Sequence, residues 1–395
     1  MLMASSFTLG FWISFSILFY AYLGYGIILF GMVKIKRMLS GSKQASPELP
    51  DPLPPVTVLI AAFNEEDYII EKIQNTLALQ YPAEKLRILI VTDGSSDNTP
   101  ELVKGYRDIT LLHQPERQGK IAAVQRAMPY VFTDLVVFTD ANTMLNKEAM
   151  LKIVRHYQDG KVGAVAGEKR IYSQQKEAAN AAGEGIYWRY ESALKKWDSE
   201  LYSVVGAAGE LFSIRKSLFE HVPADTLIED FHLTLRIAQK GYRVKYEPEA
   251  YALEGPSASI GEELKRKIRI AAGGIQAVVR LRSLLNPFRY GLLSFQYVSH
   301  RVLRWTIAPL ALLVLLLTNI GLAWSGQAFY QAVLLLQVLF YCFAVLGRIC
   351  ETQQLKIKAF FVPYYFFIMN YAVYKGFFRF LKGSQSVLWE KAKRG

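Results

Sequence analysis

The distribution of apolar positions separates membrane segments from a polar middle region. Residues 7–33 include no charged side chain, and a helix of this length, rising about 1.5 Å per residue, crosses a hydrocarbon core of about 30 Å. Lys34, Lys36 and Arg37 follow at once. Because cations are enriched on the cytoplasmic side of a span, the N-terminus is predicted outside and the next domain in the cytoplasm. The alternative is a cleaved signal peptide, but the stretch lacks a basic leader and is too long.

Apolar runs return after residue 301. Trp305–Trp324 and Ala328–Leu346 predict a hairpin of two membrane helices joined by a short uncharged turn. The last run, Ala359–Tyr374, is shorter, and the cations after it favour a cytoplasmic tail, whereas a third crossing would place that tail outside. Either this run is a re-entrant or interfacial helix, or the number of crossings differs. We expect a multi-pass protein of the cell (inner) membrane, in contact with the lipid bilayer.

Between these segments, short β-branched runs alternate with amphipathic stretches. Val56–Ala61, Arg87–Thr92 and Leu135–Phe138 have the pattern of buried strands, and apolar residues recur at helical spacing from Ile69 to Leu77. This alternation predicts an α/β domain with a largely parallel sheet. The predicted organisation is an N-terminal anchor (1–39), a linker rich in Ser and Pro (40–55), the α/β domain (56–255), amphipathic interfacial helices (256–300), C-terminal membrane helices (301–382) and a basic cytoplasmic tail (383–395).

Each of the three strands ends in a polar loop. The loops are Ala62–Glu66, Asp93–Thr99 and Thr139–Asn142. Sheets of this kind bind ligands beyond the carboxyl ends of their strands, so three polar loops at one edge predict a binding site. For any single loop, turn formation and helix capping explain the same residues equally well.

The polar motifs, taken in order, carry a resemblance. They are Phe63–Asn64–Glu65, Thr92–Asp93–Gly94–Ser95, Asp140–Ala141–Asn142, Ile228–Glu229–Asp230 and Arg266–Lys267–Ile268–Arg269. Together with the membrane helices, this series over residues 55–285 resembles the membrane-bound family 2 glycosyltransferases, which include the cellulose, chitin, hyaluronan and poly-N-acetylglucosamine synthases. The resemblance implies a Rossmann-like GT-A domain in the cytoplasm with flanking transmembrane helices.

The resemblance assigns the first two motifs to a UDP-sugar donor. Ala62, Phe63, Glu65 and Asp93 would bind its base and ribose, where carboxylates accept hydrogen bonds from N–H and hydroxyl groups. Lys120, just before a predicted helix over 121–127, matches a donor-site lysine of the family. A solvated lysine at a helix start explains it equally well.

The third motif is implied to hold a divalent metal. Asp140 and the side-chain oxygen of Asn142 would supply hard oxygen ligands to Mg²⁺ or Mn²⁺ at the donor diphosphate. In the family the motif is usually Asp-x-Asp. The asparagine removes one negative charge, which lowers the expected affinity for the ion.

The helix predicted from Glu262 to about Arg280 has an apolar face and a basic face. By itself this pattern indicates a helix at the membrane surface. In the family, Gln-x-x-Arg-Trp falls here, and Arg266 and Arg269 match its first and fourth positions, so both are implied to contact the donor, with Arg269 at the departing diphosphate. Ile270 replaces the tryptophan that the polymer synthases use to support the acceptor sugar, which puts processive synthesis in doubt.

The resemblance also implies the groups that act on the acceptor. Asp230 would be the catalytic base and Glu229 would orient it, although an aspartate at this position is also a common helix N-cap. The small residues Gly206, Ala207 and Gly209 would let the backbone approach the acceptor sugar closely.

These motifs predict an inverting, metal-assisted transfer from a UDP-sugar to a glycan acceptor in the synthesis of cell-surface or extracellular polysaccharide. The alternatives are a single-addition transferase acting on a lipid-linked acceptor and a nucleotide-sugar sensor without catalysis. A channel or transporter is disfavoured because the apolar segments are few and lack strong intramembrane charge. The net charge of +12 is explained by cations beside the membrane helices and at a diphosphate site, so no nucleic-acid partner is predicted.

Overall fold

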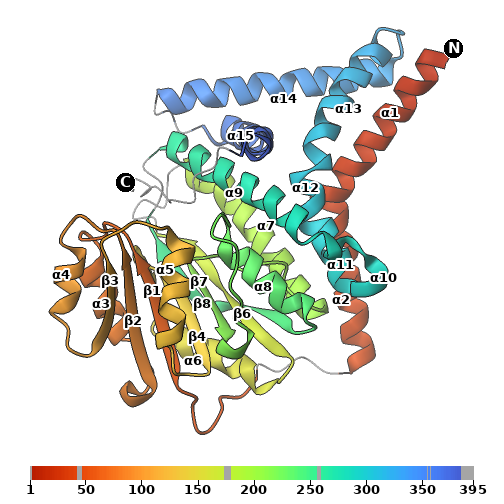
Figure 1. Cartoon of the computed structure of the whole chain (residues 1–395). Helices are drawn as coiled ribbons and strands as arrows, with labels where there is room; N and C mark the ends of the chain where they lie inside the picture. The colour runs from red at the N-terminus through yellow and green to blue at the C-terminus, as the bar shows by residue number, and fades with distance from the viewer. Residues whose placement is uncertain are drawn as a thin grey trace.

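The computed structural model places a sheet domain beneath a group of long helices (Figure 1). It describes residues 2–41, 47–172, 179–255, 259–353, 355 and 357–383. Residues 42–46 of the predicted linker and all of the predicted basic tail except Gly383 lie outside the described residues.

In the described part of the chain, the centre of the domain is an eight-stranded sheet of order β3-β2-β1-β4-β7-β6-β8-β5. Only β7 and the short edge strand β5 run against the other strands, so the predicted, largely parallel sheet is confirmed. The strands are β1 (Val56–Ala62), β2 (Leu86–Asp93), β3 (Ile109–Gln114), β4 (Leu135–Asp140), β5 (Thr143–Leu145), β6 (Val162–Ile171), β7 (Leu211–Arg215) and β8 (Arg243–Glu254).

Helices cover both faces of the sheet, so alternate residues of a strand pack into two separate cores. Val58 and Ile60 of β1 belong to the core beneath α3 (Ile69–Leu77), α4 (Thr99–Lys104) and α6 (Ala149–Val154). Leu59 and Ala61 belong to the core beneath α5 (Lys120–Ala127) and α8 (Glu229–Gln239).

The register of the parallel strands fixes the polar loops at one edge. Ala62 pairs with Thr92 of β2, and Ala61 pairs with Asp140 of β4. The three predicted polar loops therefore emerge side by side, as expected for a doubly wound sheet.

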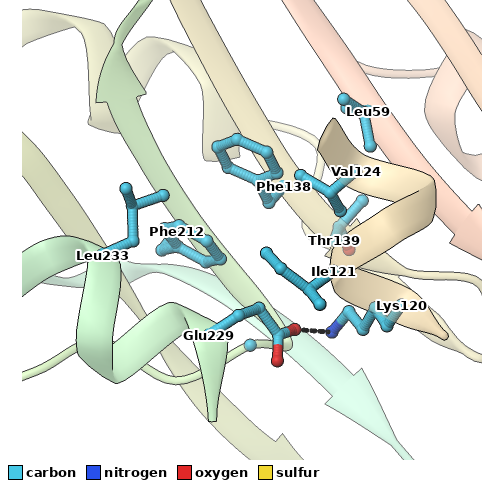
Figure 2. Close-up of a pocket in the computed structure, with 10 residues that line it drawn as sticks. Leu59, Lys120, Ile121, Val124, Phe138, Thr139, Phe212, Glu229 and Leu233 are labelled. Carbon is cyan, nitrogen blue, oxygen red and sulfur yellow. Dashed lines mark ion pairs between the residues drawn. The ribbon is translucent and has the colours of Figure 1, made fainter. Parts of the chain in front are cut away.

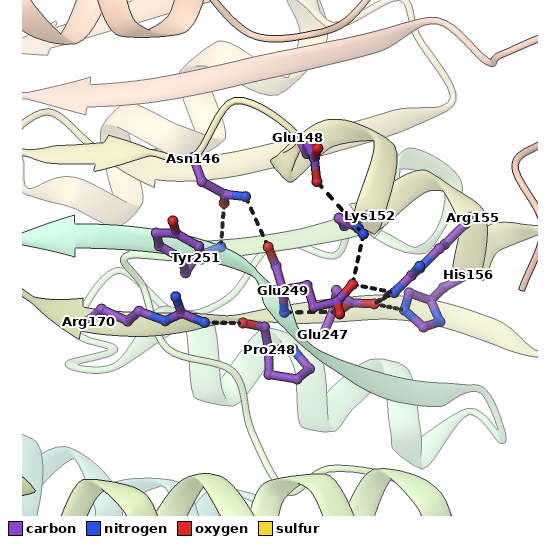
Figure 3. Close-up of polar contacts among 10 residues, drawn as sticks. All are labelled: Asn146, Glu148, Lys152, Arg155, His156, Arg170, Glu247, Pro248, Glu249 and Tyr251. Carbon is purple, nitrogen blue, oxygen red and sulfur yellow. Dashed lines mark hydrogen bonds and ion pairs between the residues drawn. The ribbon is translucent and has the colours of Figure 1, made fainter. Parts of the chain in front are cut away.

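Strand β8 changes its alignment through a bulge. Its pairing with β6 jumps from Glu247 to Tyr251, and polar contacts to α6 and the turn after it hold the bulge (Figure 3). The buried Glu247 accepts hydrogen bonds from Arg155 at 2.6 Å and from His156 at 2.7 Å. Beyond the bulge, β8 pairs with β5, the strand that follows Asn142. The bulge thus supports the turn that carries the predicted metal motif.

Two long helices separate the sheet from the membrane-type helices. They are α7 (Ala179–Leu201) and α9 (Ile260–Arg280), which lie above the sheet in Figure 1. A Cβ atom on Gly273 of α9 would lie 3.0 Å from Leu227 and Ile228, so α9 packs directly against the loop before α8. On its other side, a Cβ on Gly376 of the C-terminal helix would lie 2.7 Å from Ala271.

The apolar helices are α1 (Leu2–Phe19), the π-helical turn η1 (Tyr20–Gly24), α2 (Tyr25–Ser40), α10 (Pro287–Tyr290), α11 (Leu292–Tyr297), η7 (Val298–Val302), α12 (Leu303–Trp305), α13 (Ile307–Ala323), α14 (Ala328–Thr352) and α15 (Lys358–Leu381). Among the described helices, Ser5–Ser40 and Ala328–Thr352 are long and apolar enough to cross a membrane. The pair Leu292–Trp305 and Ile307–Ala323, bent by 53°, is a third candidate if it forms one span.

The C-terminal helices depart from a simple hairpin. Figure 1 shows α14 running across α15 rather than back along α13. Gly347 of α14 permits this packing, because a Cβ there would come within 2.4 Å of the carbonyl oxygen of Phe360. Close contact with α15 thus sets the direction of α14.

A buried polar network joins α7 to the membrane-type helices. His300 lies between two carboxylates of α7, with Nδ1 2.6 Å from Asp198 and Nε2 3.1 Å from Glu191. The hydroxyl of Tyr25 in α2 donates to Asp198 at 2.5 Å. Arg301 contacts Glu191 at 2.7 Å and donates to the carbonyl oxygen of Val205 at 3.4 Å. The network therefore connects α2 to the loop that contains Gly206.

Candidate active site

The loops after β1 and β2 are joined by reciprocal hydrogen bonds. Asn64 Oδ1 accepts from the Ser96 N–H at 2.8 Å, and Asn64 Nδ2 donates to Ser96 Oγ at 3.3 Å. Asn64 has a φ of 53°, a left-handed conformation that asparagine tolerates better than most residues. The next residue, the buried Glu65, donates its backbone N–H to Thr99 Oγ1 at 2.9 Å. These contacts bring the first two predicted motifs together.

Phe63 has a partner that the sequence pattern did not reveal. The guanidinium carbon of Arg117 lies 3.6 Å from the centre of the Phe63 ring, a cation–π contact. Ala62, the last residue of β1, is buried beside this pair. Arg117 lies in an irregular loop, where no periodicity marks it.

Asp93 acts as an anchor within the site. Its carboxylate is 0% exposed and accepts backbone hydrogen bonds from Gln118 at 3.1 Å and from Gly119 at 2.7 Å. Gly119 adopts a φ of 98°, which favours glycine. Asp93 therefore fixes the position at which α5 begins, and with it the position of Lys120.

Lys120 connects two of the predicted motifs. Its Nζ lies 2.8 Å from Asp140 Oδ1. It also lies 2.9 Å from Glu229 Oε1, the ion pair drawn in Figure 2. The side chain is only 21% exposed, so Lys120 is not the solvated helix-start lysine that the sequence also allowed. Burial alone would lower the pKa of Lys120, but the charges of Asp140 and Glu229 raise it above its ordinary value.

The wall behind this ion pair is apolar. Lys120, Gly209 and Glu229 border a small cavity (Figure 2). Its remaining lining is Leu59, Ile121, Val124, Phe138, Thr139, Phe212 and Leu233. An apolar wall excludes water, so each charge at this point depends strongly on its neighbours.

Asp230 is the second residue of α8 rather than its N-cap. The N-cap position belongs to Ile228, which makes no side-chain capping bond. Burial raises the pKa of Asp230 to about 7, and the charge of Glu229 adds to this effect. Burial also opposes ionisation of Glu229, but the charge of Lys120 holds its pKa below the ordinary value. The pKa values of these two adjacent carboxyl groups are therefore shifted in opposite directions.

The small residues of the predicted acceptor loop pack against the start of α8. Gly206 has a φ of 84°, and a Cβ there would overlap the ring of Phe231 at 2.0 Å. The N–H of Ala207 donates to Thr234 Oγ1 at 3.1 Å. A Cβ on Gly209 would lie 3.3 Å from Asp230 Oδ2 and 3.3 Å from Lys120 Nζ. The absence of a side chain at Gly209 therefore leaves space next to the Asp230 carboxyl group and the Lys120 amino group.

The two arginines of α9 have different surroundings. Arg269 donates from Nη2 to the carbonyl oxygen of Leu227 at 3.4 Å, while its buried Nε has no hydrogen-bond partner. The charge of Arg269 also helps to lower the pKa of Glu229. Arg269 thus places a positive charge beside the start of α8.

Arg266 is surrounded by carboxylates. Glu263 lies 3.2 Å from its guanidinium, Glu210 3.6 Å and Glu254 3.8 Å. Lys169 shares the last two, at 2.6 Å from Glu210 and in direct contact with Glu254. This cluster, which sequence reasoning missed because its members are far apart in the chain, attaches α9 to the ends of β6, β7 and β8.

The predicted metal ligands offer a small set of oxygen donors. Asp140 ends β4, and Asn142 lies in the turn to β5. Among the described residues no group of three or more His, Cys, Asp or Glu side chains is placed to hold an ion. One carboxylate and one amide oxygen fit Mg²⁺ or Mn²⁺ when substrate phosphates supply further ligands, which is the usual arrangement for Mg²⁺. The donor set therefore fits an ion that binds together with a diphosphate.

Comparison with known families gives a match for the sheet domain that contains most of these residues. The family model described as Glycosyl transferase family 2 matches residues 57–222. Over these residues the chain is similar to glycosyltransferase family 2, as the resemblance of its motifs predicted. The match covers β1 to β7 with the motifs at Glu65, Asp93 and Asp140, and it ends before Glu229 and Asp230.

Curated relatives support the same assignment. A poly-beta-1,6-N-acetyl-D-glucosamine synthase of Staphylococcus aureus (strain MSSA476) is 31% identical over 240 residues, covering 58% of this chain and 57% of the relative. The corresponding synthase of Staphylococcus epidermidis is 26% identical over 235 residues, covering 57% and 56%. The aligned part thus spans little more than half of these relatives.

A solved structure shares the fold over nearly the whole chain. A mannosyltransferase from Pyrobaculum calidifontis, in complex with GDP-Man and Mn²⁺, superimposes with a TM-score of 0.72 and 22% identity, covering 97% of this chain and 99% of the other. The GT-A-like fold predicted from the sequence is confirmed, and the apolar helices flank the domain as expected.

Proposed function

We propose that the protein is an integral-membrane inverting glycosyltransferase. It transfers a sugar from a UDP-sugar to a glycan acceptor at the cytoplasmic face of the membrane, in the synthesis of cell-surface or extracellular polysaccharide. The observation that carries this proposal is the contact of Lys120 with both Asp140 and Glu229, beside Asp230. It joins groups suited to a diphosphate with groups suited to deprotonating a hydroxyl, at the edge where such sheets bind ligands.

The proposed step is a direct displacement. Asp230 takes the proton of the acceptor hydroxyl as the hydroxyl oxygen forms a bond to the anomeric carbon. The bond from that carbon to the diphosphate oxygen breaks on the opposite side, and its electron pair leaves with UDP, so the configuration inverts. Lys120 and Arg269 stabilise the negative charge that develops on the leaving group. A divalent ion, when held by Asp140 and Asn142, supplies further positive charge there.

The pKa of Asp230 suits the role of a base. With a pKa of about 7 it is substantially ionised at neutral pH and still basic enough to accept a proton in the transition state. A sensor without catalysis would not need a carboxyl group with this raised pKa. A perturbed carboxyl in a ligand site is what acid–base catalysis requires.

The acceptor defines a second candidate function. Ile270 stands where the polymer synthases have a tryptophan, which favours single addition to a lipid-linked acceptor over processive synthesis. To decide, membranes containing the protein would be given a panel of UDP-sugars and GDP-Man, and products would be identified by mass. We expect sugar transfer with release of UDP. Repeated mass increments would indicate a polymer, a single increment on a lipid would indicate the second candidate, and transfer from GDP-Man alone would contradict the proposed donor.

A further inference from the structure

A lysine is buried in the domain core behind the proposed site. Lys72 belongs to α3 and is 0% exposed, between Ile69 and Ile73, which are also fully buried. Its Nζ donates to Thr139 Oγ1 at 2.8 Å and to the carbonyl oxygen of Thr143 at 2.6 Å. The two acceptors stand immediately before and after the turn Asp140–Asn142.

The hydrogen bonds continue from Lys72 to both sides of the site. Thr143 Oγ1 donates to the carbonyl oxygen of Asp140 at 3.0 Å, which closes the turn. Thr139 Oγ1 accepts from Lys72 and donates its own hydrogen to the carbonyl oxygen of Glu210 at 3.0 Å. Since Glu210 follows Gly209, the amino group of Lys72 is linked to the Asp140 turn and to the backbone next to Lys120 and Asp230.

Packing alone does not explain a lysine here. Burial lowers the pKa of Lys72 to about 7, while the charge of Asp140 opposes this shift. A methionine would fill nearly the same volume without a buried amine. What the lysine adds is a multiple hydrogen-bond donor that reaches two strand ends at once.

We propose that Lys72 is a positioning residue that holds the Asp140–Thr143 turn and the Gly209–Glu210 backbone in a fixed relation, so that the donor and the catalytic base meet in the reactive geometry. Lys72 lies behind the turn and acts through Thr139 and Thr143, without touching substrate. This inference rests on the proposed glycosyl transfer. A displacement of the reacting groups by about 1 Å from this geometry can lower the rate about 100-fold.

The test compares three variants of the full-length protein in lipid nanodiscs. Lys72→Met removes the donors and keeps the volume, and Lys72→Arg restores donors on a longer side chain. Thr76→Val is the matched control, because Thr76 is also fully buried in α3 and its hydroxyl donates only within the helix, to the carbonyl oxygen of Lys72. For each variant we would measure thermal unfolding, UDP affinity with and without Mn²⁺, and turnover at saturating UDP-sugar per UDP-binding molecule.

We expect Lys72→Met to bind UDP without metal within threefold of wild type and to lose about 10- to 100-fold in turnover per binding-competent molecule. Thr76→Val should stay within twofold, and Lys72→Arg should recover part of the loss. If Lys72→Met lowers only the unfolding temperature, with normal turnover per binding molecule, Lys72 is merely structural and the inference is wrong. A wild-type protein that binds UDP but transfers no sugar would overturn the proposed function and this role with it.

Discussion

Lys120 and Glu229 form an ion pair of 2.9 Å between the start of α5 and the start of α8. The two residues were predicted for different tasks, the lysine for the donor and the glutamate for the base. Their contact means that the charge state of one affects the other, and Asp230 lies next to both. A diphosphate that attracts Lys120 would therefore change the electrostatic environment of the base.

The pH dependence of turnover should report Asp230. Because the base must be ionised, the rate should rise with pH and level off above about 7, the pKa that burial and Glu229 give to Asp230. Glu229→Gln removes a negative neighbour, so the midpoint should move to lower pH. Lys120→Met removes a positive neighbour and should move it higher. Rate profiles at saturating donor would test the two shifts, and equal midpoints in all three proteins would contradict the assignment.

Chelation of divalent metal should abolish turnover. Asp140 and Asn142 offer only two protein oxygens, so the ion should bind weakly without nucleotide and be removed readily by EDTA. Adding Mg²⁺ or Mn²⁺ should restore activity. EDTA already loaded with Ca²⁺ is the control for effects of the chelator other than metal removal. Full activity after exhaustive chelation would show that Lys120 and Arg269 suffice for the leaving group.

The two arginines of α9 should respond differently to truncation. Arg269→Ala should lower kcat more than it raises KM for the donor, since a contact to the leaving group strengthens as charge develops. Arg266→Ala should mainly lower the unfolding temperature, because it leaves three carboxylates around a vacated site. Calorimetry together with steady-state kinetics would separate these effects. A raised KM with normal stability in Arg266→Ala would instead support donor binding by Arg266.

Much of the sheet was predictable because each strand and its loop are local in sequence. The pattern located β1, β2 and β4 and the helices α3, α5 and α9 to within a few residues. What it could not supply are contacts set by topology. Lys72 and Thr143 are 71 positions apart, and Arg266 meets Glu210 only through the packing of α9 on the sheet. The antiparallel strand β7 and the bulge of β8 likewise depend on pairing rather than on local periodicity.

Asp230→Asn separates catalysis from structure. Asparagine keeps the size of the side chain but cannot accept the proton, so transfer should fall by about 10² to 10⁴ while UDP binding persists. Stability should not fall, because the side-chain oxygen of asparagine can still accept the backbone hydrogen bond that Asp230 receives from Phe231. Since its pKa is raised on folding, the ionised aspartate reduces stability as pH rises from about 4 to about 7, and the asparagine removes this loss. The unfolding temperature of the variant relative to wild type should therefore be higher at pH 8 than at pH 5. Transfer within a few-fold of wild type would refute Asp230 as the base.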